Sequence, residues 1–430
     1  MTADPGLALA DAGAEAASAP ACRLCGEPLR RTFVDLGMSP LCETYPTAAQ
    51  VDGPETFYPL HVLVCESCLL VQLPAYVAAE EIFDDYAYFS SYSDSWVQHA
   101  RRFVDDAVDR LGLQPERSLV VEVASNDGYL LQHVLDRGIR CLGIEPSSNV
   151  AAAAVRRGVP TQVDFLGADT GRAVRAAHGP ADLVVANNVF AHVPDIVDFA
   201  HGLRALVADE GRVSIEIPHL LRLVEGNEYD TIYHEHYSYL SLLTTQRVLA
   251  AAGLTVVDVE ELASHGGSLR TWSAPSERAP DPSAALADVL AAEAAAGLHT
   301  VAGHAGFARQ VAAVRDDVLR FLLDARREGR RVVAYGAPGK GNTLLNHCGV
   351  RGDLVEFAVD RNPYKHGRFT PGTHLPIRPP EALDAARPDY VVIMPWNLRR
   401  EISAQLAHVA SWGGRLVTFL PRLDVFEPGT

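Results

Sequence analysis

Residues 120–130 read VVEVASNDGYL, an apolar run that ends in a polar turn and continues into a helix-forming segment. Uninterrupted apolar strands are typical of parallel sheets, whose two faces are both covered. Strands are predicted at 118–123, 140–145, 181–187 and 211–217, with helices at about 129–137, 148–157 and 195–208. This alternation indicates βαβ units, so the predicted fold class is α/β with a doubly wound, Rossmann-like sheet.

A second, smaller Rossmann-like α/β domain is predicted near the C-terminus. Its predicted strands are 331–335, 354–359, 389–394 and 415–419, and its helices are 341–348, about 379–386 and 398–410. An Ala-rich stretch precedes it and is predicted to form two helices joined near Gly297. The predicted domains are a disordered leader at 1–20, a cysteine-containing module at 21–75, the first α/β domain at 76–274, a helical linker at 275–328 and the C-terminal domain at 329–430.

The charge of the chain excludes some classes of partner. The 430 residues carry a formal net charge of −17, and an acidic surface repels phosphate backbones, so we expect no nucleic-acid partner. No stretch approaches the roughly 18–20 apolar residues that span a bilayer, so we expect no membrane partner. Residues 1–20 lack the basic start of a signal peptide, which favours a cytoplasmic protein. We expect a monomer or a weak homodimer.

Two Cys-x-x-Cys pairs predict a structural zinc site. The four thiolates of Cys22, Cys25, Cys65 and Cys68 would close a tetrahedral Zn²⁺ without an open position, so the metal would perform no chemistry. In a reducing compartment the arrangement favours metal over disulfides. Two alternatives stay open: buried cysteine pairs without metal, and a redox pair. The module at 21–75 is therefore predicted to be a zinc-binding module.

The turn at 124–128 predicts a cofactor site. Methyltransferases of this fold usually carry an acid and three alternating glycines here, and Ala124 and Asn126 stand at the first two glycine positions. Asn tolerates a left-handed backbone, whereas Ala124 weighs against a close approach of the cofactor. Glu145 ends the next strand and is placed to accept both ribose hydroxyl protons of an adenosyl group. The residues predicted to hold this cofactor are Glu122, Ser125, Asn126, Gly128, Glu145, Pro146, Asn187 and Asn188.

The same layout serves NAD, and Glu145 has a plainer interpretation as a solvated acid at a strand end. Two features favour a methyl donor. The Gly-x-Gly-x-x-Gly turn that binds a pyrophosphate is missing here. The run NNVFAHV at 187–193 follows an apolar strand, at the height where a cofactor and a substrate meet above such a sheet.

Residues 229–240 read YDTIYHEHYSYL and predict a catalytic base. Removing a proton from carbon requires a group of near-neutral pKa with neighbours that orient it, and histidine meets this need. A second metal site or ordinary structural residues are the alternatives. The nearby Ser264–Arg270 segment, with His265, Ser268 and Arg270, would hold a ligand or form a plain turn.

From Cys22 onward the chain resembles the nucleotide-sugar C-methyltransferases of deoxysugar biosynthesis in antibiotic-producing bacteria. The resemblance rests on the cysteine pairs and on YAYFSS (86–91), EVASNDG (122–128), NNVFAH (187–192), EIP (216–218), YHEH (233–236), HGGS (265–268), YGAPGKGNT (335–343), DRNPYK (360–365), PGTH (371–374) and PWNL (395–398). It implies S-adenosyl-L-methionine as cofactor, structural zinc, and a thymidine-diphosphate 4-keto-deoxysugar as substrate. Methylation would occur on the carbon beside the ketone, carbon 3 before carbon 5.

The resemblance also assigns roles to residues. It implies that His236 is the base, supported by Tyr233, Glu235, His192 and one tyrosine of the Tyr86/Tyr88 pair. We place Tyr86 at the catalytic site and Tyr88 and Ser91 toward the cofactor, and the spacing leaves the order of the two tyrosines open. Glu235 would fix the imidazole tautomer or bind a sugar hydroxyl, and Tyr233 or His192 would donate a hydrogen bond to the keto oxygen.

The second domain carries a glycine-rich turn before a helix, and backbone N–H groups at such a turn suit an anion. We expect this domain to help bind the nucleotide diphosphate of the substrate, or to use the turn only for packing. The residues predicted here are Gly336, Lys340, Asn342 and Lys365. Two rival functions stay open: an NAD-dependent nucleotide-sugar oxidoreductase, and a non-catalytic zinc-scaffolded binding protein.

Overall fold

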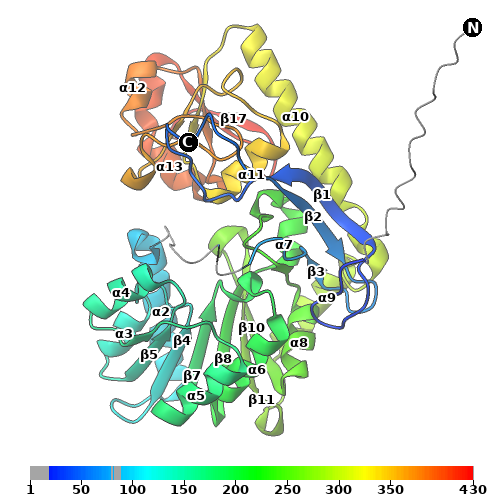
Figure 1. The fold of residues 1–430 in the computed structure, drawn as a ribbon, viewed down its shortest axis with the longest axis vertical. Helices are drawn as coiled ribbons and strands as arrows, with labels where there is room; N and C mark the ends of the chain where they lie inside the picture. Colours follow the sequence, from blue (N-terminus) through cyan, green and yellow to red (C-terminus); the bar gives the residue numbers. More distant parts are fainter. Residues whose placement is uncertain (1–18, 79–80, 82–88, 430) are drawn as a thin grey trace, which may run out of the picture.

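The computed structural model describes residues 19–78, 81 and 89–429. The leader predicted at 1–20 lies outside the described residues except for its last two positions. Within the described part of the chain, the strands form three sheets of four, seven and six strands. We call them the module sheet, the central sheet and the C-terminal sheet, and in Figure 1 they run broadly from blue through cyan and green to red.

The central sheet is doubly wound, in the order β10-β11-β8-β7-β4-β5-β6. Its strands are β4 (Leu119–Val123), β5 (Arg140–Ile144), β6 (Thr161–Gln162), β7 (Ala181–Asn187), β8 (Val207–Pro218), β10 (Leu254–Leu262) and β11 (Ser268–Pro275). Parallel neighbours lie on both sides of β4, namely β5 and β7, so the strand order reverses there. Ligands of such sheets bind beyond the carboxyl ends of the strands at this reversal. The predicted α/β fold class is confirmed.

Helices flank the central sheet. They are α2 (Asp94–Leu111), α3 (Leu131–Leu135), α4 (Ser148–Arg156), α5 (Ala168–His178), α6 (Ile196–Leu206) and α8 (Leu242–Ala251). The short helix α7 (Leu220–Glu225) follows β8 and packs its leucines into the core that contains β1 (Arg31–Ser39) and β2 (Tyr58–Val64). The bounds of α2 follow from its caps: Ser93 accepts a hydrogen bond from the Trp96 N–H, and Gly112 ends the helix with a left-handed backbone. The helices predicted at 129–137, 148–157 and 195–208 are confirmed, although α3 is shorter than expected.

The module sheet joins the N-terminal module to the first α/β domain. Its order is β1 (Arg31–Ser39), β2 (Tyr58–Val64), β3 (Val71–Gln72) and β9 (Ser238–Tyr239). The fourth strand, β9, comes from the segment that directly follows the His-Glu-His run, and Gln72 pairs with Ser238 in it. One strand of the module sheet therefore comes from a part of the chain that is distant in sequence from the other three strands.

The C-terminal sheet has the order β14-β13-β12-β15-β16-β17. Its elements are β12 (Val332–Tyr335), α11 (Gly339–His347), β13 (Ala358–Val359), β14 (Ile377–Arg378), α12 (Ala382–Ala386), β15 (Tyr390–Ile393), α13 (Arg399–Gln405), β16 (Arg415–Thr418) and β17 (Asp424–Phe426). The strand predicted at 354–359 is assigned only over its last two residues, and a turn at 352–354 precedes it. The helix predicted at 398–410 breaks into α13 and the 3-10 helix Ala407–Trp412.

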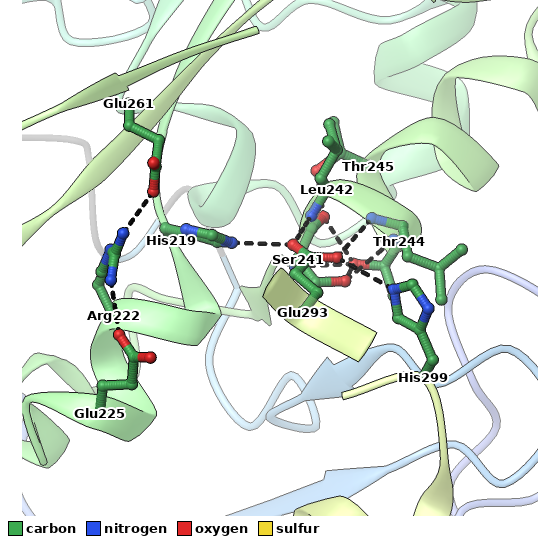
Figure 2. A network of polar contacts seen from close by, with 11 residues as sticks. His219, Arg222, Glu225, Ser241, Leu242, Thr244, Thr245, Glu261, Glu293 and His299 are labelled. Atoms are coloured by element: carbon green, nitrogen blue, oxygen red, sulfur yellow. Dashed lines mark hydrogen bonds and ion pairs between the residues drawn. The ribbon is translucent and has the colours of Figure 1, made fainter. Parts of the chain in front are cut away.

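Two helices connect the α/β domains, as predicted around Gly297: α9 (Ala284–Ala295) and α10 (Phe307–Arg327). Glu293 anchors α9, and Figure 2 shows its surroundings. Its buried carboxylate accepts hydrogen bonds from Nε2 of His219 over 2.8 Å and from the backbone N–H of Leu242 at the start of α8. In the described residues, no helix is both long and apolar enough to cross a bilayer.

Candidate active site

A cavity of about 480 Å³ lies beyond the carboxyl ends of β4, β5 and β7. Its lining comes from three parts of the chain. The zinc-binding module supplies Glu43, the first α/β domain supplies residues between Ser90 and His236, and the C-terminal domain supplies residues between Pro338 and Leu398. This volume is within the range of small-molecule sites. The cavity therefore joins the predicted cofactor turn, the predicted base and the C-terminal glycine-rich turn in one space.

The turn after β4 adopts the backbone that three glycines would give it. Ala124, Asn126 and Gly128 have φ angles of 53°, 49° and 79°. For Ala124 this left-handed conformation costs roughly 1–2 kcal/mol, since its Cβ crowds the following carbonyl oxygen. At Gly128 a Cβ would lie 2.8 Å from Cγ2 of Val159, so this position also lacks room for a side chain. Ala124 thus adopts a glycine-like backbone in this turn, and it lines the cavity.

Glu145 lines the cavity just after β5, and two backbone donors hold its carboxylate. Its Oε2 accepts from the Asn126 N–H and its Oε1 from the Ser147 N–H, both over 2.9 Å. Burial raises the pKa of Glu145, whereas these hydrogen bonds oppose the rise. Each carboxylate oxygen can accept a further bond, so the group suits a ribose diol. Pro146 lines the cavity beside it.

Two asparagines line the cavity after β7. The side chain of Asn187 is buried, and neither its Oδ1 nor its Nδ2 has a hydrogen-bond partner among the described residues. Asn188 has a φ of 52°, and its N–H donates to the Glu216 carbonyl over 2.7 Å. Burying an amide without a hydrogen-bond partner costs free energy. A ligand with polar groups at its edge would supply the missing partners of Asn187.

The loop after β6 also lines the cavity, although none of its residues was predicted from the sequence. Asp164, Phe165 and Leu166 lie there. The strand before them has only two residues. A strand this short shows no period, so the only available signal was an acid at about the right distance after β5.

Other predicted cofactor residues lie beneath the cavity and support the turn. Ser91 donates to Asp127, whose carboxylate forms an ion pair of 2.8 Å with Arg157. Ser125 packs against Gly143, where a Cβ would lie 2.3 Å from its Oγ. Glu122 is buried in β4, and burial raises its pKa well above the usual range. The predicted Tyr86 and Tyr88 lie outside the described residues.

The four described residues predicted for catalysis meet at one wall of the cavity: Tyr233, Glu235, His236 and His192. Nδ1 of His236 lies 2.7 Å from the Thr231 carbonyl oxygen. Because a carbonyl only accepts, Nδ1 carries the hydrogen, and the neutral ring has its lone pair on Nε2. The tautomer is therefore fixed by Thr231 and not, as one hypothesis had it, by Glu235.

The rings around His236 form a compact cluster. The ring centroid of His192 lies 4.5 Å from that of His236 in an edge arrangement, and that of Tyr233 lies 4.1 Å away. Burial and the nearby His236 lower the pKa of His192 well below its usual value. His192 is accordingly neutral near pH 7, so it can donate or accept without adding charge.

Glu235 is buried beside the same cluster. Burial, followed by the nearby Glu43, raises the pKa of Glu235 to about 8, while a hydrogen bond from Cys42 opposes the rise. Sγ of Cys42 lies 3.7 Å from its Oε1. Near neutral pH most of Glu235 is thus protonated and can donate a hydrogen bond.

Among the predicted substrate residues of the C-terminal domain, Lys340 lines the cavity. Its Nζ donates to Oδ1 of Asn397 and lies 4.9 Å from the Trp396 ring centroid. The other three hold the domain together. Lys365 donates to the hydroxyl of Tyr45 and to the Ala337 carbonyl, each over 2.8 Å.

Two further predicted residues of this turn have packing positions. Asn342 donates from Nδ2 to the Cys42 carbonyl over 2.7 Å, and Gly336 has a φ of 84° against the ring of Pro395. Lys365 and Asn342 therefore fasten the loop of the zinc-binding module to the C-terminal turn. This arrangement agrees with the packing interpretation for these positions and leaves Lys340 as the cation at the cavity.

The Ser264–Arg270 segment points elsewhere. Arg270 is buried and forms an ion pair of 2.9 Å with Glu216, on the neighbouring strand. Ser268 donates to the Ser264 carbonyl over 3.1 Å. The side chain of His265 lies outside what the structure describes. In the described residues this segment forms a turn whose placed side chains have partners away from the cavity.

The four predicted zinc ligands come together. Their Sγ atoms all lie within 4.8 Å of one another, and the Cys22–Cys68 and Cys25–Cys65 pairs are each 3.5 Å apart. Zn–S bonds of about 2.3 Å in a tetrahedron place sulfurs roughly 3.8 Å apart, so the cluster fits the ion. Nε2 of Gln72 donates to Sγ of Cys22 over 3.1 Å, which supports a thiolate.

Comparison with known proteins agrees with this architecture. A methyltransferase domain model matches residues 96–259, a model for the C-terminal domain of C-methyltransferases matches 263–421, and a zinc binding domain model matches 22–83. Sheet, cavity and domain match together define an S-adenosylmethionine-dependent methyltransferase.

A relative that matches nearly the whole chain identifies a more specific family than the methyltransferase domain alone. The chain is 35% identical over 406 residues to the C-methyltransferase NovU of Streptomyces niveus, which covers 94% of this chain and 96% of that protein. The chain belongs to this family of C-methyltransferases with an N-terminal zinc binding domain.

Solved structures resemble part of the chain. Magnesium protoporphyrin IX methyltransferase of Synechocystis PCC 6803, with bound S-adenosylmethionine, is 15% identical with a TM-score of 0.32, over 45% of this chain and 88% of that one. An S-adenosylmethionine-dependent methyltransferase of Clostridium acetobutylicum is 10% identical with a TM-score of 0.34, over 41% of this chain and 91% of that one.

Proposed function

We propose that the enzyme methylates a thymidine-diphosphate 4-keto-deoxysugar on the carbon beside the ketone, at carbon 3 in preference to carbon 5. The observation that carries this proposal is the fixed tautomer of His236. Its hydrogen-bonded Nδ1 leaves the lone pair on Nε2, in a ring that lines the same cavity as the cofactor turn. The C-methyltransferase name of the relative supports transfer to carbon.

His236 is the proposed base. A C–H bond beside a ketone loses its proton only if the negative charge that develops on the keto oxygen is stabilised. Nε2 of His236 takes the proton. Tyr233, neutral His192 or protonated Glu235 donates to the keto oxygen, and one such donor contributes roughly 3–4 kcal/mol. When bound, S-adenosylmethionine supplies the methyl group that the carbon acquires.

The residues at the turn after β4 orient the cofactor. Glu145 is held toward the cavity by two N–H donors, which suits the ribose hydroxyls, and Asn187 offers a buried amide nearby. Holding both reactants in one small cavity contributes as much as the base, because well-oriented groups gain up to roughly 7–11 kcal/mol over free encounter.

Lys340 is the proposed handle for the diphosphate. It lies at the C-terminal wall of the cavity in a chain of net charge −17, where a local cation is needed to hold a phosphorylated sugar. Asn397 and the ring of Trp396 position its ammonium group. Lys365 is engaged with Tyr45 and is assigned no substrate contact.

Proton exchange tests the proposal. Enzyme, S-adenosylmethionine and a 4-keto sugar nucleotide in D₂O should give a product heavier by one methylene, in which the methylated carbon has lost its proton. Substrate recovered before it is methylated should carry deuterium at the same carbon. His236→Asn should abolish both exchange and methylation. His234→Asn is the matched control, since Nε2 of His234 faces the Pro59 carbonyl in the module at 3.2 Å. Exchange that persists in His236→Asn would assign the base to another residue.

A further inference from the structure

Arg23 lies between Cys22 and Cys25 in the first Cys-x-x-Cys pair, and its side chain reaches the loop that ends at Pro194 and the residue after β3. Nη1 donates to the Pro194 carbonyl over 2.9 Å, and Nη2 donates to the Leu73 carbonyl. The guanidinium also lies over the ring of Tyr237, 5.4 Å from its centroid. A guanidinium that donates to two carbonyls and lies on an aromatic ring is held in one position and orientation.

The groups that Arg23 holds carry the proposed chemistry. Tyr237 directly follows His236; its N–H donates to the Ala191 carbonyl over 2.8 Å, and its carbonyl accepts from the Leu73 N–H over 2.9 Å. Pro194 closes the cavity loop that begins at Asn187 and contains His192. One side chain therefore fastens the His236 segment, the His192 loop and the end of β3 to each other.

The backbone of Arg23 is in turn tied to the metal ligands. Its N–H donates to Oε1 of Gln72 over 2.9 Å, while Nε2 of the same Gln72 donates to Sγ of Cys22 over 3.1 Å. Gln72 pairs across the module sheet with Ser238, two residues beyond His236. A chain of contacts thus runs from the sulfur cluster to the two segments that carry His192 and His236.

We propose that Arg23 is a positioning residue, which transmits the rigid geometry of the cysteine cluster to His192 and His236. The zinc-binding module then aligns the base without taking part in the chemistry. The role assigned to His236 rests on the proposed function, whereas the positioning of the two segments by Arg23 is a structural statement that stands separately.

The test compares Arg23→Gln, Arg23→Lys and Arg247→Gln in the zinc-loaded full chain. Arg247 is the matched control, because its Nη1 donates to the carbonyl of the ligand Cys68 over 2.6 Å from α8. Three quantities are measured: zinc bound per chain, hydrogen–deuterium exchange of residues 187–194 and 231–240, and kcat and KM for methylation. Arg23→Lys keeps the charge but not the two-pronged geometry, and it serves if Arg23→Gln does not fold.

In Arg23→Gln we expect full zinc content and an unchanged KM for S-adenosylmethionine. Hydrogen–deuterium exchange should rise in both segments. The kcat should fall roughly 10- to 100-fold, which is the effect of moving a catalytic group by about 1 Å. Arg23→Lys should lie between, and Arg247→Gln should match the wild type.

Unchanged exchange in both segments of Arg23→Gln and Arg23→Lys would overturn the positioning role. An equal rise in exchange and an equal fall in kcat in Arg247→Gln would also overturn the positioning role, because they would show a general weakening of the module. If exchange rises as expected while the wild type itself methylates no 4-keto sugar, the positioning stands and the proposed function fails.

Discussion

Replacing Glu293 by Gln should destabilise the enzyme by about 2–4 kcal/mol. The carboxylate is fully buried, and its Oε1 accepts from Nε2 of His219 over 2.8 Å and from the backbone N–H of Leu242 (Figure 2). Its Oε2 accepts from the Leu243 N–H over 3.2 Å and lies 3.5 Å from Nε2 of His299. Glutamine keeps one accepting oxygen but turns an NH₂ group toward the remaining donors. Hydrogen bonds to a charged group contribute about 1.5–3 kcal/mol each, and a buried donor left without a partner adds a cost.

Urea unfolding followed by circular dichroism measures the change, from the shift of the midpoint at constant slope. The control is Glu225→Gln, also in Figure 2, whose carboxylate forms an ion pair of 2.6 Å with Arg222 but whose side chain is 51% exposed. Exposed pairs contribute about 0–1 kcal/mol, so this variant should remain close to the wild type. If Glu293→Gln also stays within about 0.5 kcal/mol of the wild type, the reasoning that α9 is anchored by a buried charge is refuted.

Three substitutions of residues that line the cavity give further predictions. Ala124→Gly should stabilise the protein by roughly 0.5–1 kcal/mol, since relief of the left-handed strain exceeds the entropy that glycine adds to the unfolded chain; a lower melting temperature would contradict this. Folded Glu235 keeps its proton up to a pKa of about 8, against about 4.5 when unfolded, so stability should fall as the pH rises through this window. The slope is at most about 1.4 kcal/mol per pH unit, and Glu235→Gln should lose this component in urea titrations at pH 6 and 8. Lys340→Ala should raise the KM for the sugar nucleotide about tenfold while the affinity for S-adenosylhomocysteine, read by calorimetry, stays the same; equal weakening of both would remove Lys340 from the diphosphate site.

Local patterns in the sequence predicted several features well. The parallel strands of the central sheet are buried on both faces, so each appears in the sequence as a continuous apolar run, whichever segments pack against it. The two cysteine pairs predicted a metal cluster because each pair brings two ligands together by its own short turn. The polar turn at 124–128 was also visible, and the structure added that Ala124 accepts the strained backbone.

The sequence by itself therefore determined the α/β class, the cysteine cluster and the segment that contains His236, since each depends on residues close together along the chain. Only the tertiary structure decided which polar groups face the cavity. Arg270 pairs with Glu216 on the next strand, and Lys365 binds Tyr45 of the zinc-binding module, so both charges are used by partners far away in the sequence. The pairing of β3 with β9, which brings Arg23 beside the His236 segment, is a long-range contact of the same kind. Such partners are set by strand order and packing, for which no local spacing provides a signal.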